Sequence, residues 1–337
     1  MSSANRKSGS ALLLALVTVV VLSTLMVTFL FRVHMESDLA IRSRFGMKAE
    51  VLAEAGQEYG KWMVIQSVNT GNEADDDRGE TFFVAAKNLQ RGVALTGYRI
   101  DMEDGFILLS ITPESSRRNV NRLSDPDWEQ LLENSGVPER EHAKLISAFR
   151  DWTDEDETSR LLGAEEDDSY YQDLELPVKD GPIENLSELG MIRGFTSAIL
   201  YGGTLEDYYD KPEVDVSGIL GTLSVYGDET ISLNAATRDV LLSLSGIREE
   251  QVDQILEGRA GNDGELGTED DGFSNVEQGL AAASLSGDTQ SLFSVSDLRF
   301  VRITSIGEVG GIRKGTLAIY EFTGSEMTLL SYQESDL

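Results

Sequence analysis

The chain has 337 residues, and 28 Lys and Arg residues against 59 Asp and Glu residues give it a net charge of −31. That length suffices for two or three ordinary domains with a real hydrophobic core. So acidic a surface repels nucleic acid, because affinity for DNA and RNA depends on Lys and Arg side chains that neutralise phosphates. The absence of cysteine excludes disulfides and thiolate zinc sites, and the two histidines, His34 and His142, are too few for a histidine-rich metal site.

The N-terminal region contains an apolar stretch, since residues 8–31 carry no charge and Leu, Val, Ala and Thr dominate from Ala11 onward. At about 1.5 Å per residue, a helix over this stretch is about 30 Å long and spans the hydrocarbon core of a bilayer. Arg6 and Lys7 precede it, so the positive-inside rule places the N-terminus in the cytoplasm. A secretory signal peptide is the alternative, but its apolar region is shorter, roughly 7–15 residues. We therefore predict a retained transmembrane helix.

The helical pattern continues beyond the membrane, because apolar and small residues recur there at spacings of three and four. These residues are Phe45, Ala49, Leu52, Gly56, Tyr59 and Met63. The pattern predicts one helix, with some bend, from about Ala11 to Ile65. A coiled coil is disfavoured because no strict heptad is sustained.

Strand patterns occur in two distant parts of the chain. Residues 97–111 alternate around an Asp104-Gly105 turn, which is a strong hairpin signal, and residues 299–333 contain three further strand-like runs. Together they predict one antiparallel sheet packed on the N-terminal helix. A short helix is expected near 81–90.

The intervening stretch, about 112–290, is acidic and helical. Residues 127–152 and 234–259 each form a predicted helix, glycine turn and second helix, and both resemble helix-hairpin-helix, or SAM-like, units. Such units often bind DNA backbone at a helix N-terminus. Glutamates follow both turns and would repel phosphate, so protein packing is the favoured interpretation and no nucleic-acid partner is expected.

The residues before the apolar stretch, Arg6-Lys7-Ser8-Gly9, resemble the type III leader of prepilins, in which a prepilin peptidase cuts after glycine. The resemblance implies cleavage between Gly9 and Ser10, with a methylated new N-terminus. Most pilins place a glutamate at the fifth mature position, which here is Leu14. K-type pseudopilins lack that glutamate, so its absence points to this subgroup.

Further motifs match the K-type minor pseudopilins of bacterial type II secretion (general secretion pathway protein K) in the same order along the chain. They are Asn119-Val-Asn121-Arg-Leu123, Asp151-Trp152-Thr-Asp154-Glu-Asp156, Gly163-Ala164-Glu165, Tyr170-Tyr171, Leu186-Ser-Glu188-Leu189, Leu233-Asn234-Ala235-Ala236 and Phe273-Ser-Asn-Val276. Two departures are Ala236-Thr237 in place of Ala-Pro and a longer, more acidic loop at 261–272. They allow a relative that serves a type IV pilus-like machine.

The resemblance implies an α+β fold, in which a pilin-like long N-terminal helix packs on an antiparallel sheet and a large all-α domain with two SAM-like units is inserted. The expected boundaries are a leader at 1–9, a transmembrane helix at 10–31, a pilin-like part at 32–111, the inserted domain at 112–290 and the C-terminal strands at 291–337.

The implied function is that of a minor pseudopilin in the inner membrane. With the I- and J-type minor pseudopilins, it would cap the tip of a short periplasmic pseudopilus and act in assembly initiation and protein export. The alternative is a membrane-anchored, calcium-dependent binding module without a filament role. No Walker A loop, HExxH or GxSxG motif is present, so we expect no enzyme activity.

Two acidic stretches have the composition of calcium sites, which use six to eight oxygen ligands on flexible loops. The first contains Asp151, Asp154, Asp156, Glu165 and Asp167, and the second contains Asp263, Glu265, Asp270 and Asp271. Calcium binding by the head is implied by the family resemblance. The alternative is a solvated acidic face. The second stretch is not a complete EF-hand, because the twelfth position from Asp263 is Ser274.

Overall fold

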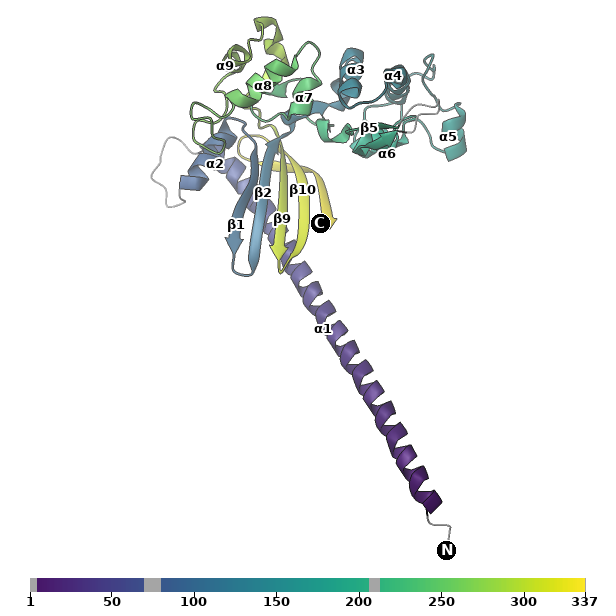
Figure 1. Cartoon of the computed structure of the whole chain (residues 1–337). Coiled ribbons are helices and arrows are strands. Elements are labelled where there is room, and N and C mark those ends of the chain that lie inside the picture. The colour runs from purple at the N-terminus through teal and green to yellow at the C-terminus, as the bar shows by residue number, and fades with distance from the viewer. Residues whose placement is uncertain (1–4, 70–79, 206–212, 337) are drawn as a thin grey trace.

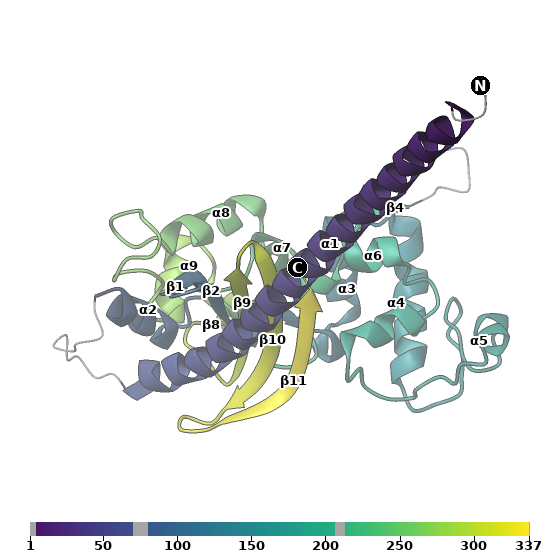
Figure 2. The same cartoon turned by 90° about the horizontal axis from the view of Figure 1, so that it is seen from below.

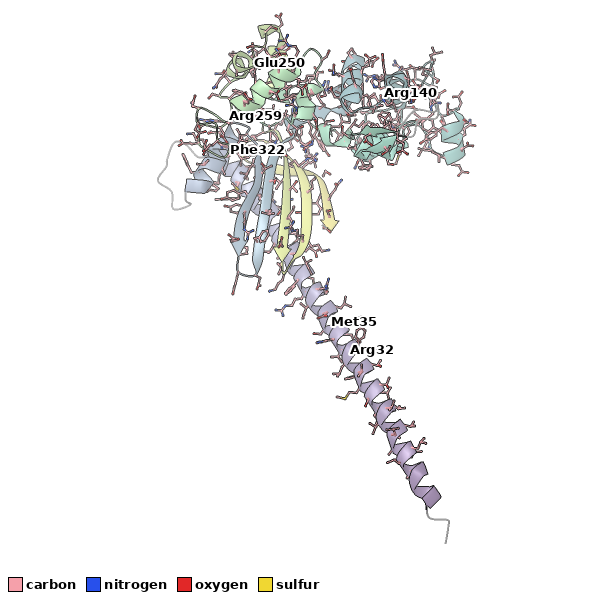
Figure 3. All side chains as sticks on the ribbon, in the orientation of Figure 1. Arg32, Met35, Arg140, Glu250, Arg259 and Phe322 are labelled. Carbon is pink, nitrogen blue, oxygen red and sulfur yellow. The ribbon has the colours of Figure 1, made fainter. Side chains whose placement is uncertain are left out.

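The computed structural model describes residues 5–69, 80–205 and 213–336. Its longest element is the helix α1 (Asn5–Asn69), which extends well beyond the rest of the molecule (Figure 1). Every described side chain from Ala11 to Arg44 is exposed, and Arg32 and Met35 project from this bare part of the helix (Figure 3). The predicted helix of about 11–65 is therefore confirmed, and the observed helix is six residues longer at its N-terminal end and four residues longer at its C-terminal end.

The sheet is formed by two segments that lie far apart in sequence. Its strands are β1 (Leu95–Met102), β2 (Gly105–Pro113), β9 (Phe300–Val309), β10 (Ile312–Phe322) and β11 (Met327–Asp336). They are antiparallel in the order β1-β2-β9-β10-β11, as the strand patterns predict. Met102 pairs with Gly105, so a two-residue turn closes the first hairpin at the Asp-Gly signal.

One face of the sheet packs against the C-terminal half of α1. The approach is close because small residues meet there. A Cβ on Gly307 would lie well inside the van der Waals contact distance of the Ala49 carbonyl oxygen, and one on Gly56 would collide with the Ser305 hydroxyl. Beyond this contact, Met63, Leu109 and other fully buried side chains form the core, and the helix α2 (Glu80–Gln90) covers its upper end.

Between β2 and β9 the chain leaves the sheet and forms two lobes across its upper end (Figures 1 and 2). The first lobe, residues 120–225, and the second lobe, residues 231–295, each have their own hydrophobic core. Their α-helices are α3 (Asp125–Asn134), α4 (Glu139–Thr153), α5 (Ser169–Leu174), α6 (Ser197–Tyr201), α7 (Arg238–Leu242), α8 (Glu249–Gly258) and α9 (Val276–Ala282). The α3–α4 and α7–α8 pairs are the two predicted helical pairs.

The insertion also contains short strands and 3₁₀ turns, so it is less purely helical than the all-α expectation. The strands are β3 (Arg118–Asn119), β4 (Gly203–Leu205), β5 (Val214–Val216), β6 (Leu223–Ser224), β7 (Ile231–Ser232) and β8 (Phe293–Ser294). The 3₁₀ segments are Glu114–Ser116, Val120–Arg122, Leu186–Met191, Leu220–Thr222 and Gly287–Leu292. The strand pairs are two or three residues long and satisfy backbone groups where loop segments run side by side. Strands of two or three residues are too short to show a hydrophobic periodicity, so the sequence does not predict them.

A buried carboxylate joins the sheet to the first lobe. Glu114, just after β2, is fully buried and accepts a 2.6 Å hydrogen bond from Nε of Arg302 on β9. It also accepts a hydrogen bond from the hydroxyl of Ser224 in β6. Burial, together with the nearby Arg302 charge, lowers the pKa of Arg117 to about 10. A single side chain therefore ties together three segments that belong to different parts of the molecule.

Candidate functional site

The first acidic stretch lies where α4 ends and the loop toward α5 begins. Asp151 is on the last turn of α4, and its side chain is fully buried. Its carboxylate accepts hydrogen bonds of 3.3 Å and 3.1 Å from the backbone N–H of Arg160, whose guanidinium also lies 3.5 Å away. Gly163 lies so close that a Cβ there would collide with the Asp151 carboxylate. The loop is therefore folded back over the end of the helix.

Glu165 follows in the same loop and is the most unusual side chain of the cluster. It is 4% exposed, and its Oε1 atom has no hydrogen-bond partner. Burial raises its pKa to about 7, and the negative charges of Asp151, Asp154 and further acids add to the effect. One oxygen of Asp154, Oδ1, is likewise buried without a partner. Two buried carboxylate oxygens are thus left unsatisfied in one neighbourhood, which normally calls for an ion, a water or a proton.

An acidic cavity of about 630 Å³ opens beside Glu165. Acidic side chains dominate its lining, with Tyr171 and Leu176 among the exceptions. The acids are Glu157, Glu165, Glu166, Asp167, Glu175 and Asp180. Arg193 holds the surrounding loop, since it pairs with Asp168 and donates a 2.9 Å hydrogen bond to the Leu162 carbonyl.

The five predicted calcium ligands of this stretch do not all lie together. Asp151, Asp154 and Glu165 share the buried neighbourhood, whereas Asp156 and Asp167 are exposed at its margin. Within residues 5–69, 80–205 and 213–336, no three Asp, Glu or His side chains form a group arranged to hold a metal ion. The chemistry of the site nevertheless fits a hard cation, because a divalent ion would supply the partner that the orphaned oxygens of Asp154 and Glu165 lack.

The second acidic stretch uses its carboxylates differently. Asp270 accepts a 2.7 Å hydrogen bond from the backbone N–H of Asn262, and Asp271 accepts one of 2.6 Å from that of Gly267. Asp263 accepts from the backbone N–H of Glu265 two residues on. These contacts shape the loop itself and leave no orphaned carboxylate oxygen in its described side chains.

The same loop is attached to α2. Glu269 pairs with Lys87, which lowers the pKa of that carboxyl. Arg91 donates hydrogen bonds of 2.9 Å and 3.1 Å to the carbonyls of Glu269 and Asp271. The extra acidic residues of this loop therefore bind the second lobe to the helix that covers the sheet.

Two residues that matter at the first cluster do not stand out in sequence. Asp180 lines the cavity and acts on Glu165 from a separate segment. Arg160 partly neutralises Asp151 and Asp154, although nothing in its surroundings marks it. Neither residue belongs to a motif that could have marked it, and the positive φ of 52° at Asp180 is visible only in the structure.

Gly9 and Ser10, the predicted processing residues, lie near the start of α1. Their side chains are outside the described residues, and the cleavage stays a prediction. An 18-residue window of this helix has a mean hydropathy of 2.6 and is not buried. Its length and composition fit a single-pass membrane anchor.

A long N-terminal helix that is bare at one end and packed on an antiparallel sheet at the other defines a pilin-like protein. The family model described as "Type II secretion system (T2SS), protein K" matches residues 108–201. The chain is 25% identical over 163 residues to the type II secretion system protein K of Klebsiella pneumoniae, which covers 44% of this chain and 45% of that protein. The chain thus spans about half the length of that curated relative.

The fold is also similar to a solved structure, the GspK-GspI-GspJ complex from the enterotoxigenic Escherichia coli type 2 secretion system. The TM-score is 0.57 at 14% identity, and the match covers 91% of this chain and 100% of that chain. At this identity the likeness shows the fold. The family match, the curated relative and the fold agree, and they support a K-type minor pseudopilin, which confirms the family resemblance.

Proposed function

We propose that this chain caps the tip of a periplasmic pseudopilus, where it initiates assembly together with I- and J-type minor pseudopilins and so serves protein export. The observation that carries the proposal is the breadth of the two lobes, which extend across the end of the sheet farthest from the bare helix (Figures 1 and 2). Subunits of a pilin-like filament stack along their helices. A subunit with so wide a top leaves no room for another above it. Its role is structural and not enzymatic.

The membrane arrangement follows from the same proposal. Residues 1–9 form a leader with a cytoplasmic N-terminus, residues 10–31 cross the inner membrane, and the head is periplasmic. Residues 32–111 and 291–337 then form the pilin-like part, and residues 112–290 form the inserted domain. Arg6 and Lys7 before the apolar span support this orientation.

The test is co-expression of the full chain with I- and J-type pseudopilins and a prepilin peptidase, followed by intact mass spectrometry and affinity purification. We expect loss of residues 1–9, a methylated Ser10, and a complex with one copy of this chain. Gly9→Val should abolish processing, whereas Gly46→Ala, on the same helix with only a Lys314 carbon near its added Cβ, should not.

An unprocessed chain that still binds calcium would contradict the filament role and favour a membrane-anchored calcium-dependent module. Processing with incorporation along the filament length, seen by immunogold labelling, would contradict the capping role. Processing without any affinity for the I and J types would favour a type IV pilus-like machine.

We further propose that the first acidic cluster binds calcium through Asp151, Asp154 and Glu165, with Asp156 and Asp167 as candidates from the margin. Its support is the pair of buried, unpartnered oxygens on Asp154 and Glu165. A calcium ion would offset the mutual repulsion of these carboxylates and fix the loop between α4 and α5. The second stretch, Asp263, Glu265, Asp270 and Asp271, is the weaker candidate because its three aspartates already accept hydrogen bonds from backbone N–H groups.

Isothermal titration of the chelator-treated protein with calcium tests this assignment. We expect Glu165→Gln to weaken calcium binding at least tenfold. Glu175→Gln, which removes an equal charge from an exposed position on the same cavity, should have little effect. If the Asp263→Asn/Glu265→Gln variant loses calcium and Glu165→Gln retains it, the site is in the second lobe instead.

A further inference from the structure

The last strand of the sheet is an open edge. β11 pairs with β10 along its whole length, from Met327 to Asp336, and no described strand lies on its other side. Every second residue of an edge strand directs its backbone N–H and C=O groups away from the sheet, and such a row is a template for another strand. Proteins commonly protect long edges with proline or inward-pointing lysine, and β11 contains neither.

The regular part of this edge is the run from Ser331 to Asp336. A register shift between Ile319 and Tyr320 places a bulge at Leu330, and bulges usually interrupt edge pairing. Beyond it, six consecutive residues pair with Lys314–Ile319 without irregularity. Six residues are enough for a short strand to add to the sheet.

Apolar side chains are exposed along this edge. Leu329 is 52% exposed and Tyr332 is 41% exposed. Tyr332 pairs with Ala318, which is buried under α1, so the Tyr332 side chain lies on the face of the sheet that α1 occupies. Because α1 packs mainly on β2, β9 and β10, it leaves this face of β11 uncovered. We call this uncovered face, with Leu329 and Tyr332, the shelf.

The shelf is bordered by negative charge. Glu50 and Glu54 on α1 and Glu334 on β11 raise the pKa of Tyr332, after the larger effect of burial. Glu50 and Glu54 are exposed. They are one helical turn apart and therefore present two carboxylates on the same side of α1.

We propose that the β11 edge is a docking site for an extended, basic segment of another protein chain, which adds as a sixth strand beside Ser331–Asp336. An added strand lies about 5 Å outside β11. Its alternate side chains would face α1, where lysine or arginine would meet Glu50, Glu54 and Glu334 and an apolar side chain would cover Tyr332. This site is separate from the acidic cavity and does not depend on the capping role.

The negative charge beside the β11 edge favours a basic segment over a second copy of this chain as the binding partner. Pairing of two β11 edges would bring Glu334 and the neighbouring glutamates of two copies together, and like charges that face one another across paired strands repel. Backbone hydrogen bonds would provide affinity, and the three glutamates would provide the preference for a basic partner.

A fluorescein-labelled ten-residue peptide of alternating lysine and valine serves as the probe, with fluorescence anisotropy measured on the full chain in detergent. We expect Glu50→Lys/Glu54→Lys to weaken binding at least tenfold. Glu133→Lys/Glu257→Lys, which changes net charge equally at exposed positions on α3 and α8, should weaken it less than threefold. The same peptide N-methylated at alternate residues cannot pair with an edge and should also bind at least tenfold more weakly to the unaltered chain.

Four outcomes would overturn the proposal. They are no binding of the probe, equal weakening by the two double variants, equal binding of the N-methylated peptide, and a concentration-dependent dimer in sedimentation velocity that the probe does not dissociate. The N-methylated peptide keeps the test decisive even if a substituted chain folds poorly.

Discussion

At the scale of single residues, Glu165 is a carboxyl group placed where its charged form is disfavoured. Burial and neighbouring acids raise its pKa in the folded protein to about 7, from an ordinary value of 4.5. The folded state therefore holds this proton more tightly than the unfolded state does. The contribution of Glu165 to stability is greatest below pH 4.5, falls as the pH rises toward 7, and is constant above it.

In metal-free protein, the variant Glu165→Gln should be more stable than the unaltered chain at pH 8, because it removes the cost of ionising a buried carboxyl. The expected gain in the free energy of unfolding is about 1–3 kcal/mol, and it should vanish near pH 4. Urea denaturation in the presence of chelator measures it. Glu175→Gln, at an exposed position on the same cavity, is the control. A gain that is equal at both pH values would show that the Glu165 proton is not its origin.

At the scale of elements, the position of α1 on the sheet depends on a few small residues. Gly307 on β9 faces the backbone of α1 at Ala49 and Ala53, and backbone atoms cannot rotate aside as a side-chain tip can. A methyl group at this point must separate helix and sheet. The loss would extend along the whole contact between α1, β9 and β10.

We therefore expect Gly307→Ala to destabilise the protein by about 1–3 kcal/mol through overpacking. Gly221→Ala is the matched control, because an added Cβ there has no neighbour within 4 Å and needs no unusual φ. Thermal unfolding followed by circular dichroism compares the two. If both variants melt together with the unaltered chain, helix and sheet have more room to separate than the contact at Gly307 implies.

The elements also show what periodicity can and cannot predict. The α1 helix, the Asp104-Gly105 hairpin and the strands near the C-terminus follow from spacings within a few residues of one another. The pairing of β2 with β9 joins residues about 190 to 200 positions apart, and it was predictable because two half-buried hairpins need a common partner. The two-residue strand pairs of the lobes carry no such pattern.

The candidate site was predictable only in part for a related reason. Asp151, Asp154 and Glu165 come from two motifs that follow one another closely in the chain, so sequence brings them to one neighbourhood. Whether a carboxylate oxygen has a hydrogen-bond partner depends on the positions of nearby backbone N–H groups. Residue type alone does not predict those positions. Asp270 and Asp271 resemble the first group in composition, yet the loop turns its own N–H groups toward them.

At the scale of the whole molecule, the Glu114–Arg302 pair couples the lobes to the pilin-like sheet. The Glu114 side chain is fully buried, so removing Arg302 deprives a carboxylate away from water of its closest cation and leaves it only the Ser224 hydroxyl and the Arg117 guanidinium 4.0 Å away. We expect Arg302→Met to cost about 3–5 kcal/mol. The double variant Glu114→Gln/Arg302→Met should recover at least half of that loss. Differential scanning calorimetry should show a separate, earlier transition of the lobes in the single variant.

Arg313→Met is the control for this coupling, because Arg313 also pairs with a glutamate across the β9–β10 hairpin but is largely exposed. Its effect should stay within about 1 kcal/mol. If Arg302→Met unfolds in one transition at the temperature of the control, the sheet and the lobes are held together by other contacts.

The bare stretch of α1 from Arg32 to Arg44 also fixes the distance and the orientation of the head relative to the apolar span. Its 13 exposed residues place the head about 20 Å beyond the end of the apolar span, and each residue of a helix adds about 1.5 Å and a turn of about 100°. Deleting one residue would swing the head by more than a quarter of a circle about the helix axis. Deleting seven would lower it by about 10 Å while it faces almost the same way. On the proposed membrane arrangement, the number of residues in this stretch sets the height and the direction in which the β11 edge faces other membrane-anchored proteins.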